Sequence, residues 1–116
     1  MTRITFFRRN GEFYGFEETG HTGYGDSGND ILCAALSAMT MLVVNTIETS
    51  FAGNVDYQID ADGAKITVEC KNALSEFESD EKKRFAVSGV FQGYFYELND
   101  LLEEYYDFLD VDLKDE

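Results

Sequence analysis

The sequence predicts an α+β fold in which antiparallel hairpins form a sheet packed against two helices. Two turn dipeptides predict the hairpins, because Asn-Gly at 10–11 and Asp-Gly at 62–63 each stand between strand-like runs. Two long segments predict the helices: 29–50 is almost continuously apolar, and 81–106 repeats apolar residues at intervals of three and four. The expected order is β-β-α-β-β-α, within a single domain over residues 1–116.

The second hairpin has a predicted register that places Cys70. A two-residue turn at 62–63 puts Cys70 on an apolar face, which favours a buried packing thiol over a reactive one. The same register sets Asp56 against Glu69, a like-charge pair that weighs against this turn length. The pairs expected on the apolar face are Ile59 with Ile66, Tyr57 with Val68, and Val55 with Cys70.

The segment 29–50 predicts a helix that needs cover on several sides, from the sheet and from another element. Gly53 is predicted to end it as the residue in the left-handed conformation. The longest apolar run, 31–44, is shorter than the ~20 residues that cross a bilayer. A buried helix is therefore expected, and not a membrane span.

The segment 81–106 predicts an amphipathic helix packed on the sheet by its apolar face. Its surplus of aromatic residues could also form a subunit interface. The last ten residues, DFLDVDLKDE, predict either a short strand or an acidic tail.

Charge and cysteine content narrow the classes of function. The chain has 23 Asp and Glu against 9 Lys and Arg, a formal net charge of -14. This charge repels phosphate backbones and anionic lipids, so it argues against nucleic-acid and membrane partners. It suits solubility or attraction of a basic partner. Two cysteines at unrelated spacing and no charged leader before the first strand indicate a cytoplasmic protein with reduced thiols.

Cys33 is the first candidate for chemistry. It is predicted in the first turn of the central helix, with Ser27, Asn29 or Asp30 as the capping side chain. Unpaired amides and the helix dipole lower the pKa of a thiol at such a position, which favours the nucleophilic thiolate. The alternative is a cysteine that only packs.

His21 is the only histidine and precedes Cys33 by twelve positions. If the second strand ends beside the start of the helix, the imidazole can take the thiol proton and complete a Cys-His dyad. The alternative is a histidine on a surface loop. Glycines let the intervening segment fold back or act as a lid. They are Gly20, Gly23, Gly25 and Gly28.

Polar residues form one stripe on the central helix because they recur at intervals of three and four: Asp30, Cys33, Ser37 and Thr40. Asp30 could orient His21 or cap the helix, and Ser37 could support the site or bond to its own helix backbone. One cysteine, one histidine and scattered carboxylates have no metal-ligand spacing, so no metal or other cofactor is expected. Gly-Tyr-Gly at 23–25 has no following lysine and predicts no phosphate site.

The stretch GHTGYG, a short polar linker and NDILCAALS resemble the signature of the ribosomal-processing cysteine protease family, Prp. In that family a Gly-His pair ends a strand and a flexible glycine-containing loop follows. The segment Asp-Ile-(Val or Leu)-Cys-Ala-Ala-x-Ser then begins the central helix. The matching positions are Gly20, His21, Asp30, Ile31, Cys33, Ala34, Ala35 and Ser37. Chain length and element order also fit the family.

The resemblance implies a cytoplasmic bacterial endopeptidase that removes an N-terminal extension from large-subunit ribosomal protein twenty-seven and so supports ribosome assembly. It implies a homodimer with Cys33 as nucleophile, His21 as general base and acid, and Asp30 and Ser37 as supporting residues. An apolar groove is expected for the substrate residues before the cut, and the acidic surface would attract the basic substrate. Residues 22–29 become the mobile cover of the cleft, with Thr22, Gly23, Gly25 and Gly28 among them.

Three alternatives stay open from the sequence. The first is a non-catalytic ribosome-associated binding factor with the same fold. The second is a thiol redox sensor in which Cys33 oxidises reversibly. The third is a domain in which Cys33 is structural.

Overall fold

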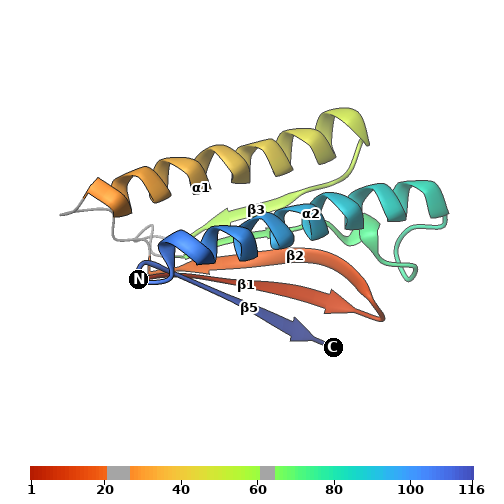
Figure 1. Ribbon diagram of the computed structural model, residues 1–116. Helices are drawn as coiled ribbons and strands as arrows, with labels where there is room; N and C mark the ends of the chain where they lie inside the picture. The colour runs from red at the N-terminus through yellow and green to blue at the C-terminus, as the bar shows by residue number, and fades with distance from the viewer. Residues whose placement is uncertain (21–26, 61–64) are drawn as a thin grey trace.

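The computed structural model describes residues 1–20, 27–60 and 65–116, with side chains from residue 31 onward in the second range. Within these ranges, five strands form one sheet, and two long helices lie on one side of it (Figure 1). The predicted α+β class is confirmed. In chain order the elements are β1 (Thr2–Arg9), β2 (Glu12–Thr19), α1 (Ser27–Asn45), η1 (Thr46–Ser50), β3 (Asp56–Ile59), β4 (Lys65–Glu69), η2 (Lys71–Ala73), α2 (Glu81–Tyr105) and β5 (Leu109–Asp115).

The sheet has the strand order β3-β4-β2-β1-β5. β1 and β2, β2 and β4, and β3 and β4 pair antiparallel, whereas β5 runs parallel to β1. The chain therefore ends in a strand, the first of the two predicted forms of the last ten residues. Backbone hydrogen bonds hold both ends of this strand, from Thr2 N to Phe108 O and from Glu116 N to Arg8 O, each 2.8 Å.

Both predicted hairpins are present. Asn10 and Gly11 have φ angles of 52° and 83° and form the two-residue turn between β1 and β2. The turn of the second hairpin lies outside the described residues, but its strands have the predicted register, with Asp56 opposite Glu69. Cys70 is confirmed as a packing thiol, because it is only 1% exposed.

The end of the central helix differs from the prediction. α1 continues into a π-helical turn, η1, and the residue that then adopts the left-handed conformation is Ala52, with φ of 53°. Gly53 is instead buried and lies against Ile47 and Cys70, where a β-carbon would not fit. Gly53 is therefore required for close packing and not for a positive φ angle.

The helical stretch Ile31–Ser50 is long and apolar enough, by length and composition alone, to cross a membrane. In the fold one face of this helix belongs to the core, where Leu32, Leu36 and Ile47 are 0–1% exposed, and 33% of the stretch is buried. The predicted cover on several sides is therefore wrong: the opposite side of α1 is exposed, with Ile31 60% and Leu42 64% exposed.

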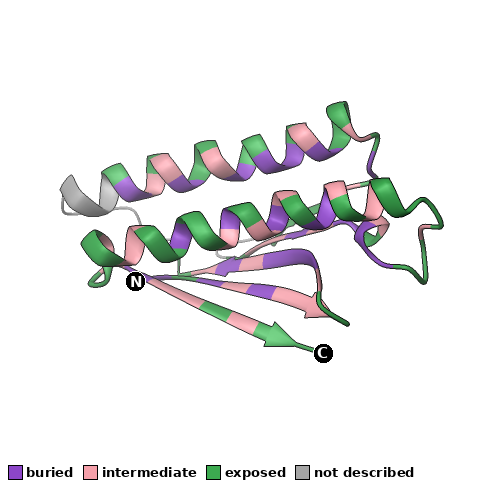
Figure 2. Ribbon diagram, turned by 45° about the vertical axis from the view of Figure 1, so that its right-hand side comes forward, coloured by how far each residue is buried: buried purple, intermediate pink, exposed green. Residues whose placement is uncertain are grey.

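The core lies between the helices and one face of the sheet, where the buried residues of all these elements meet (Figure 2). Aromatic rings fill its centre: Phe16 of β2 contacts Phe91 and Tyr94 of α2 edge to face. Asp80 caps the start of α2, because its carboxylate accepts hydrogen bonds from the amides of Lys82 and Lys83 in the first turn. It contacts β2 and β5, while α1 lies beside it toward the β3 edge (Figure 1).

Candidate active site around Cys33

Cys33 lies in the second turn of α1, and not in the first turn as predicted. The helix begins at Ser27, two residues earlier than expected, so Cys33 is its seventh residue. Because the field of a helix end falls off within one turn, it acts less strongly on this thiol than the sequence suggested. Gly28 likewise lies inside the helix and not in a mobile loop. A glycine and its polar neighbours are tolerated in a first turn, where four amides have no helical partner.

The thiol of Cys33 stands at the margin of the sheet-facing side of α1. With 3.6 residues per turn, Thr40 and Val44 project within about 20° of Cys33. Both of these residues are about 5% exposed, whereas Cys33 itself is only partly buried. Ser37, one turn further along the helix, is exposed. Cys33 therefore lies at the boundary between the buried and the exposed faces of α1.

The second strand ends where the family signature begins. β2 stops at Thr19, and Gly20 follows with φ of 72°, in the left-handed region. A β-carbon on Gly20 would collide with the carbonyl oxygen of Met1. Two features therefore require glycine at this position: the positive φ angle and the close approach of Met1, which precedes β1.

Several predicted site residues lie outside the described residues: His21, Thr22, Gly23 and Gly25. Asp30 has a described backbone, which is helical, and no described side chain. Its backbone position inside α1 makes it the fourth helical residue and not the capping one. Among the side chains that the structure describes, no three of His, Cys, Asp or Glu gather in a metal-binding arrangement.

The structure contains a buried polar cluster that the sequence did not predict, although Thr40 belongs to the predicted polar stripe. It consists of Glu18 of β2, Thr40 of α1 and Tyr94 of α2, which are 4–5% exposed. The Thr40 and Tyr94 hydroxyls lie 3.3 Å apart. Burial raises the pKa of Tyr94, and the nearby charge of Glu18 raises it further. The available signal was Glu18 itself, a charged residue on the same face of its strand as Phe16.

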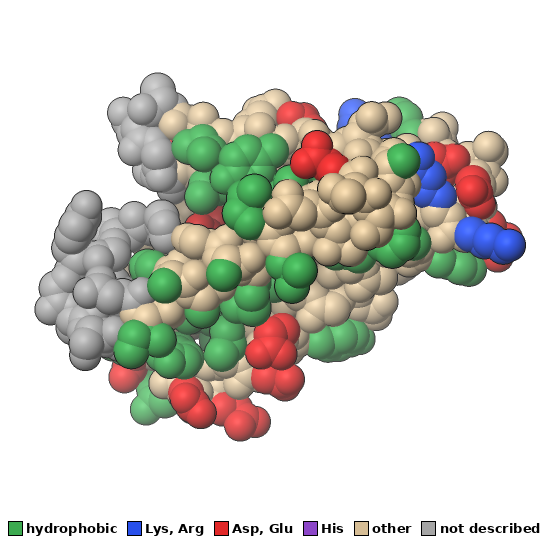
Figure 3. Space-filling view, turned by 90° about the horizontal axis from the view of Figure 1, so that it is seen from above, with side chains coloured by type: hydrophobic (Ala, Val, Ile, Leu, Met, Phe, Trp, Pro, Cys, Tyr) green, Lys and Arg blue, Asp and Glu red, His purple; other side chains and the backbone are tan. Residues whose placement is uncertain are grey.

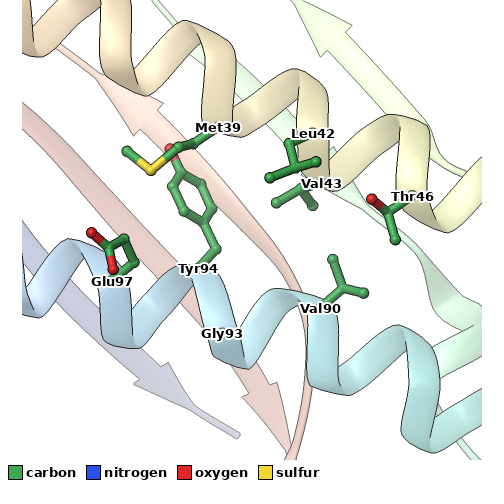
Figure 4. Close-up of a pocket in the computed structure, with 8 residues that line it drawn as sticks. All are labelled: Met39, Leu42, Val43, Thr46, Val90, Gly93, Tyr94 and Glu97. Atoms are coloured by element: carbon green, nitrogen blue, oxygen red, sulfur yellow. The ribbon is translucent and has the colours of Figure 1, made fainter.

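An apolar groove of about 320 Å³ runs between α1 and α2 (Figure 4). It lies on the opposite flank of α1 from Cys33, because Leu42 projects about 180° and Met39 about 120° away from the thiol. Hydrophobic side chains gather on the face seen from above (Figure 3). The Lys and Arg side chains in that view lie at its right-hand end. The groove is lined by Met39, Leu42, Val43, Thr46, Val90, Gly93, Tyr94 and Glu97.

Comparisons with known proteins agree on one family. Residues 1–110 match the sequence model of the family described as cysteine protease Prp. The solved structure of SMU.848 from Streptococcus mutans is 31% identical, with a TM-score of 0.81, and the alignment covers 100% of this chain and 99% of that one. Comparison with curated protein sequences found no match.

Two structures of the essential ribosomal processing protease Prp from S. aureus share the fold. The complex with a substrate peptide is 20% identical, with a TM-score of 0.78, and the complex with a covalently linked product peptide is 21% identical, with a TM-score of 0.76. In both comparisons the alignment covers 98% of this chain and 100% of the other. From the family match along nearly its whole length, this chain belongs to the Prp family of cysteine proteases.

Proposed function

We propose that this protein is a cytoplasmic endopeptidase that removes the N-terminal extension of bacterial large-subunit ribosomal protein twenty-seven, with Cys33 as nucleophile and His21 as general base and acid. Membership of the cysteine protease family Prp supports the reaction class. Relatives described as ribosomal processing proteases, solved with substrate and product peptides, support the substrate class.

The observation that carries the proposal is the contrast between the two thiols. Cys70 is 1% exposed and its thiol donates to Asn72 Oδ1 at 3.3 Å, so it is sealed in the core. Cys33 is partly exposed at the margin of a packed helix face. A nucleophile needs this combination, because packing fixes its rotamer while the open side admits a substrate carbonyl.

In the proposed reaction, the Cys33 thiolate attacks the scissile carbonyl carbon, and His21 protonates the leaving amine. Water then attacks the thioester, His21 removes the proton of that water, and the thiol is regenerated as the carboxylate product leaves. The amides at the start of α1, on residues 27–30, have no acceptor within the helix and would donate hydrogen bonds to the oxyanion. The net charge of -14 would speed encounter with a basic ribosomal protein.

A cleavage assay tests the proposal directly. The purified protein is incubated with ribosomal protein twenty-seven of its own host, extension included, and the products are weighed by mass spectrometry. A single cut near the N-terminus is expected. Cys33→Ala and His21→Ala should each abolish it, whereas Cys70→Ala, the matched thiol control, should retain it if the variant folds.

Each alternative has a distinct outcome in the same assay. Cleavage that persists in Cys33→Ala would contradict the mechanism. Tight binding of the ribosomal protein without any cut would favour a non-catalytic binding factor. Reversible oxidation of Cys33 that changes a binding property, with no proteolysis, would favour a redox sensor.

A homodimer is part of the proposal. The exposed side of α1 carries no charged residue between Ile31 and Ile47, although the chain as a whole is strongly acidic. Two acidic copies repel each other except where their surfaces are uncharged, which makes this face the most suitable contact. Sedimentation equilibrium should show a dimer, and Leu42→Glu, at a side chain 64% exposed, should dissociate it. Unchanged association of this variant would exclude the face.

A further inference from the structure

The edge strand β3 presents apolar side chains on the helix-facing side of the sheet without being covered there. Tyr57 lies opposite Val68 and Ile59 opposite Ile66, so both side chains point to the same side as the core. Val68 is 0% exposed, yet Tyr57 is 39% and Ile59 52% exposed. The helices therefore stop short of the sheet edge and leave an apolar strip along β3.

The backbone of the same two residues is directed at the open edge. Asp60 N donates to Lys65 O at 3.0 Å, which makes these two residues a hydrogen-bonded pair of the antiparallel ladder. Because such pairs alternate, Tyr57 and Ile59 are the non-hydrogen-bonded positions, and their N–H and C=O groups point away from β4. Among the described residues, β3 is the last strand at this edge of the sheet.

This strip and Cys33 lie toward the same end of the molecule, where β2 and β3 finish and α1 begins (Figure 1). The groove between the helices occupies the opposite flank of α1, as the positions of Leu42 and Met39 show. In Figure 1, α1 is drawn above β3 and runs in the opposite direction, so α1 begins at the end of the molecule at which β3 finishes. An extended chain that approaches Cys33 from this end, on the side of α1 away from α2, has the open edge of β3 within its path.

We propose that β3 binds the substrate as an added strand, in which the extended segment next to the scissile bond pairs with the backbone of Tyr57 and Ile59. Strand addition to a sheet edge derives affinity from main-chain hydrogen bonds and specificity from alternate side chains. Every second substrate residue then lies on Tyr57 and Ile59 and is apolar. This inference rests on the proposed proteolytic function and adds to it the residues that select the substrate.

Charge favours a peptide substrate over a second copy as the occupant. Asp56 and Asp60 point to the other side of the sheet at this edge, with Glu69 and Lys65 opposite them on β4, so the intervening residues of an added strand would meet a surface that is acidic on balance. Basic or polar side chains suit these positions, as in a basic ribosomal protein. The edge of a second copy would instead bring its own acids against them, which is unfavourable.

Binding to an inactive variant tests the surface separately from catalysis. A fluorescein-labelled peptide that spans the cut in ribosomal protein twenty-seven is titrated with Cys33→Ala, and the dissociation constant is read from fluorescence anisotropy. Adding Ile59→Ser or Tyr57→Ser should weaken binding about tenfold, the loss expected for an apolar contact of this size. In the active protein, the same changes should raise KM and leave kcat nearly unchanged.

Matched controls carry serine substitutions elsewhere on the surface. Phe85→Ser removes an apolar side chain that is 56% exposed, and Tyr96→Ser removes a tyrosine that is 57% exposed, both on α2. Both should change the dissociation constant less than twofold. Peptides N-methylated at single amides should lose affinity at every second position, because only alternate amides of an added strand face the sheet.

The outcomes separate the two proposals. Cleavage by the active protein together with undiminished binding by Ile59→Ser and Tyr57→Ser would overturn the strand-addition site and leave the protease function standing. Binding that follows the expected pattern, without cleavage by the active protein, would overturn the protease function and leave the strand-addition site standing. Self-association that Ile59→Ser abolishes, with unchanged peptide binding, would assign the edge to a second copy and overturn the inference. If the peptide is neither cut nor bound, both proposals fail.

Discussion

Gly53 donates its amide hydrogen to the carbonyl oxygen of Ile47 at 2.9 Å, and the two residues are packed so closely that no β-carbon fits between them. A methyl group on the Gly53 Cα would lie 2.5 Å from Ile47 Cγ2 and 3.1 Å from Cys70 Sγ. This close contact lets the chain turn between η1 and β3 while Ile47 and Gly53 both stay buried.

Gly53→Ala should lower the free energy of unfolding by about 1–3 kcal/mol, the usual cost of overpacking a buried site. Gly89→Ala is the control, because a β-carbon there meets nothing within 4 Å inside α2. It should raise stability by about 0.5–1 kcal/mol, since alanine favours the helix. Urea denaturation measures both. Equal effects of the two substitutions would contradict the packing argument.

The buried hydroxyl pair of Thr40 and Tyr94 should stabilise the contact between α1 and α2. Tyr94→Phe leaves the Thr40 hydroxyl without its 3.3 Å partner and should cost about 1 kcal/mol. Thr40→Val leaves the Tyr94 hydroxyl without the same partner and should also lower stability. The double variant should lose less than the sum of the two single losses, because the second substitution removes a group already deprived of its partner. Additive losses in a denaturation cycle would show that the two hydroxyls do not interact.

The two thiols should react at different rates. Burial raises the pKa of the Cys70 thiol, and its side chain is closed to reagents. Cys33 is partly exposed, so iodoacetamide at neutral pH should label it first, by about tenfold or more in rate. Peptide mapping by mass spectrometry follows each site, and Cys70→Ala should label as fast as the parent protein. Equal labelling of both cysteines would contradict the assigned burial.

The like-charge pair of Asp56 and Glu69 should reduce stability at neutral pH. Burial raises the pKa of Glu69, and the opposing Asp56 carboxylate raises it further. A raised pKa in the folded state contributes stability at pH values below the unfolded value, and this stability is lost as the pH rises through the folded value. Asp56→Asn should therefore stabilise the protein at neutral pH by about 0.2–1 kcal/mol.

The gain from Asp56→Asn should vanish at about pH 3, where both carboxyls are protonated. Thermal unfolding at the two pH values measures it. Asp110→Asn is the control of opposite sign, because its carboxylate pairs with Arg3 Nε at 2.9 Å and the substitution removes a surface ion pair. A gain that is the same at both pH values would exclude repulsion as its cause.

The sequence was sufficient to predict those features in which neighbours along the chain set the conformation of a residue. Asn10-Gly11 and the register that pairs Tyr57 with Val68 follow from turn chemistry and strand alternation, and both are as predicted. The family signature around Cys33 is equally local, and the family assignment that it implied is confirmed. The sequence by itself therefore determined the fold class, the packing role of Cys70 and the family.

Contacts between distant segments decided the rest. A glycine after a helical segment predicts a left-handed helix cap, but Gly53 is instead required for packing against Ile47 and Cys70. No local pattern in the sequence encodes that packing. The start of α1 at Ser27 moved Cys33 into the second turn, and the side of α1 that the sheet covers decides which flank of the thiol stays open. The exposure of Tyr57 and Ile59 likewise depends on how far α1 reaches over the sheet edge. These features arise only when two layers are packed together, because burial is a property of the assembled surface and not of the chain.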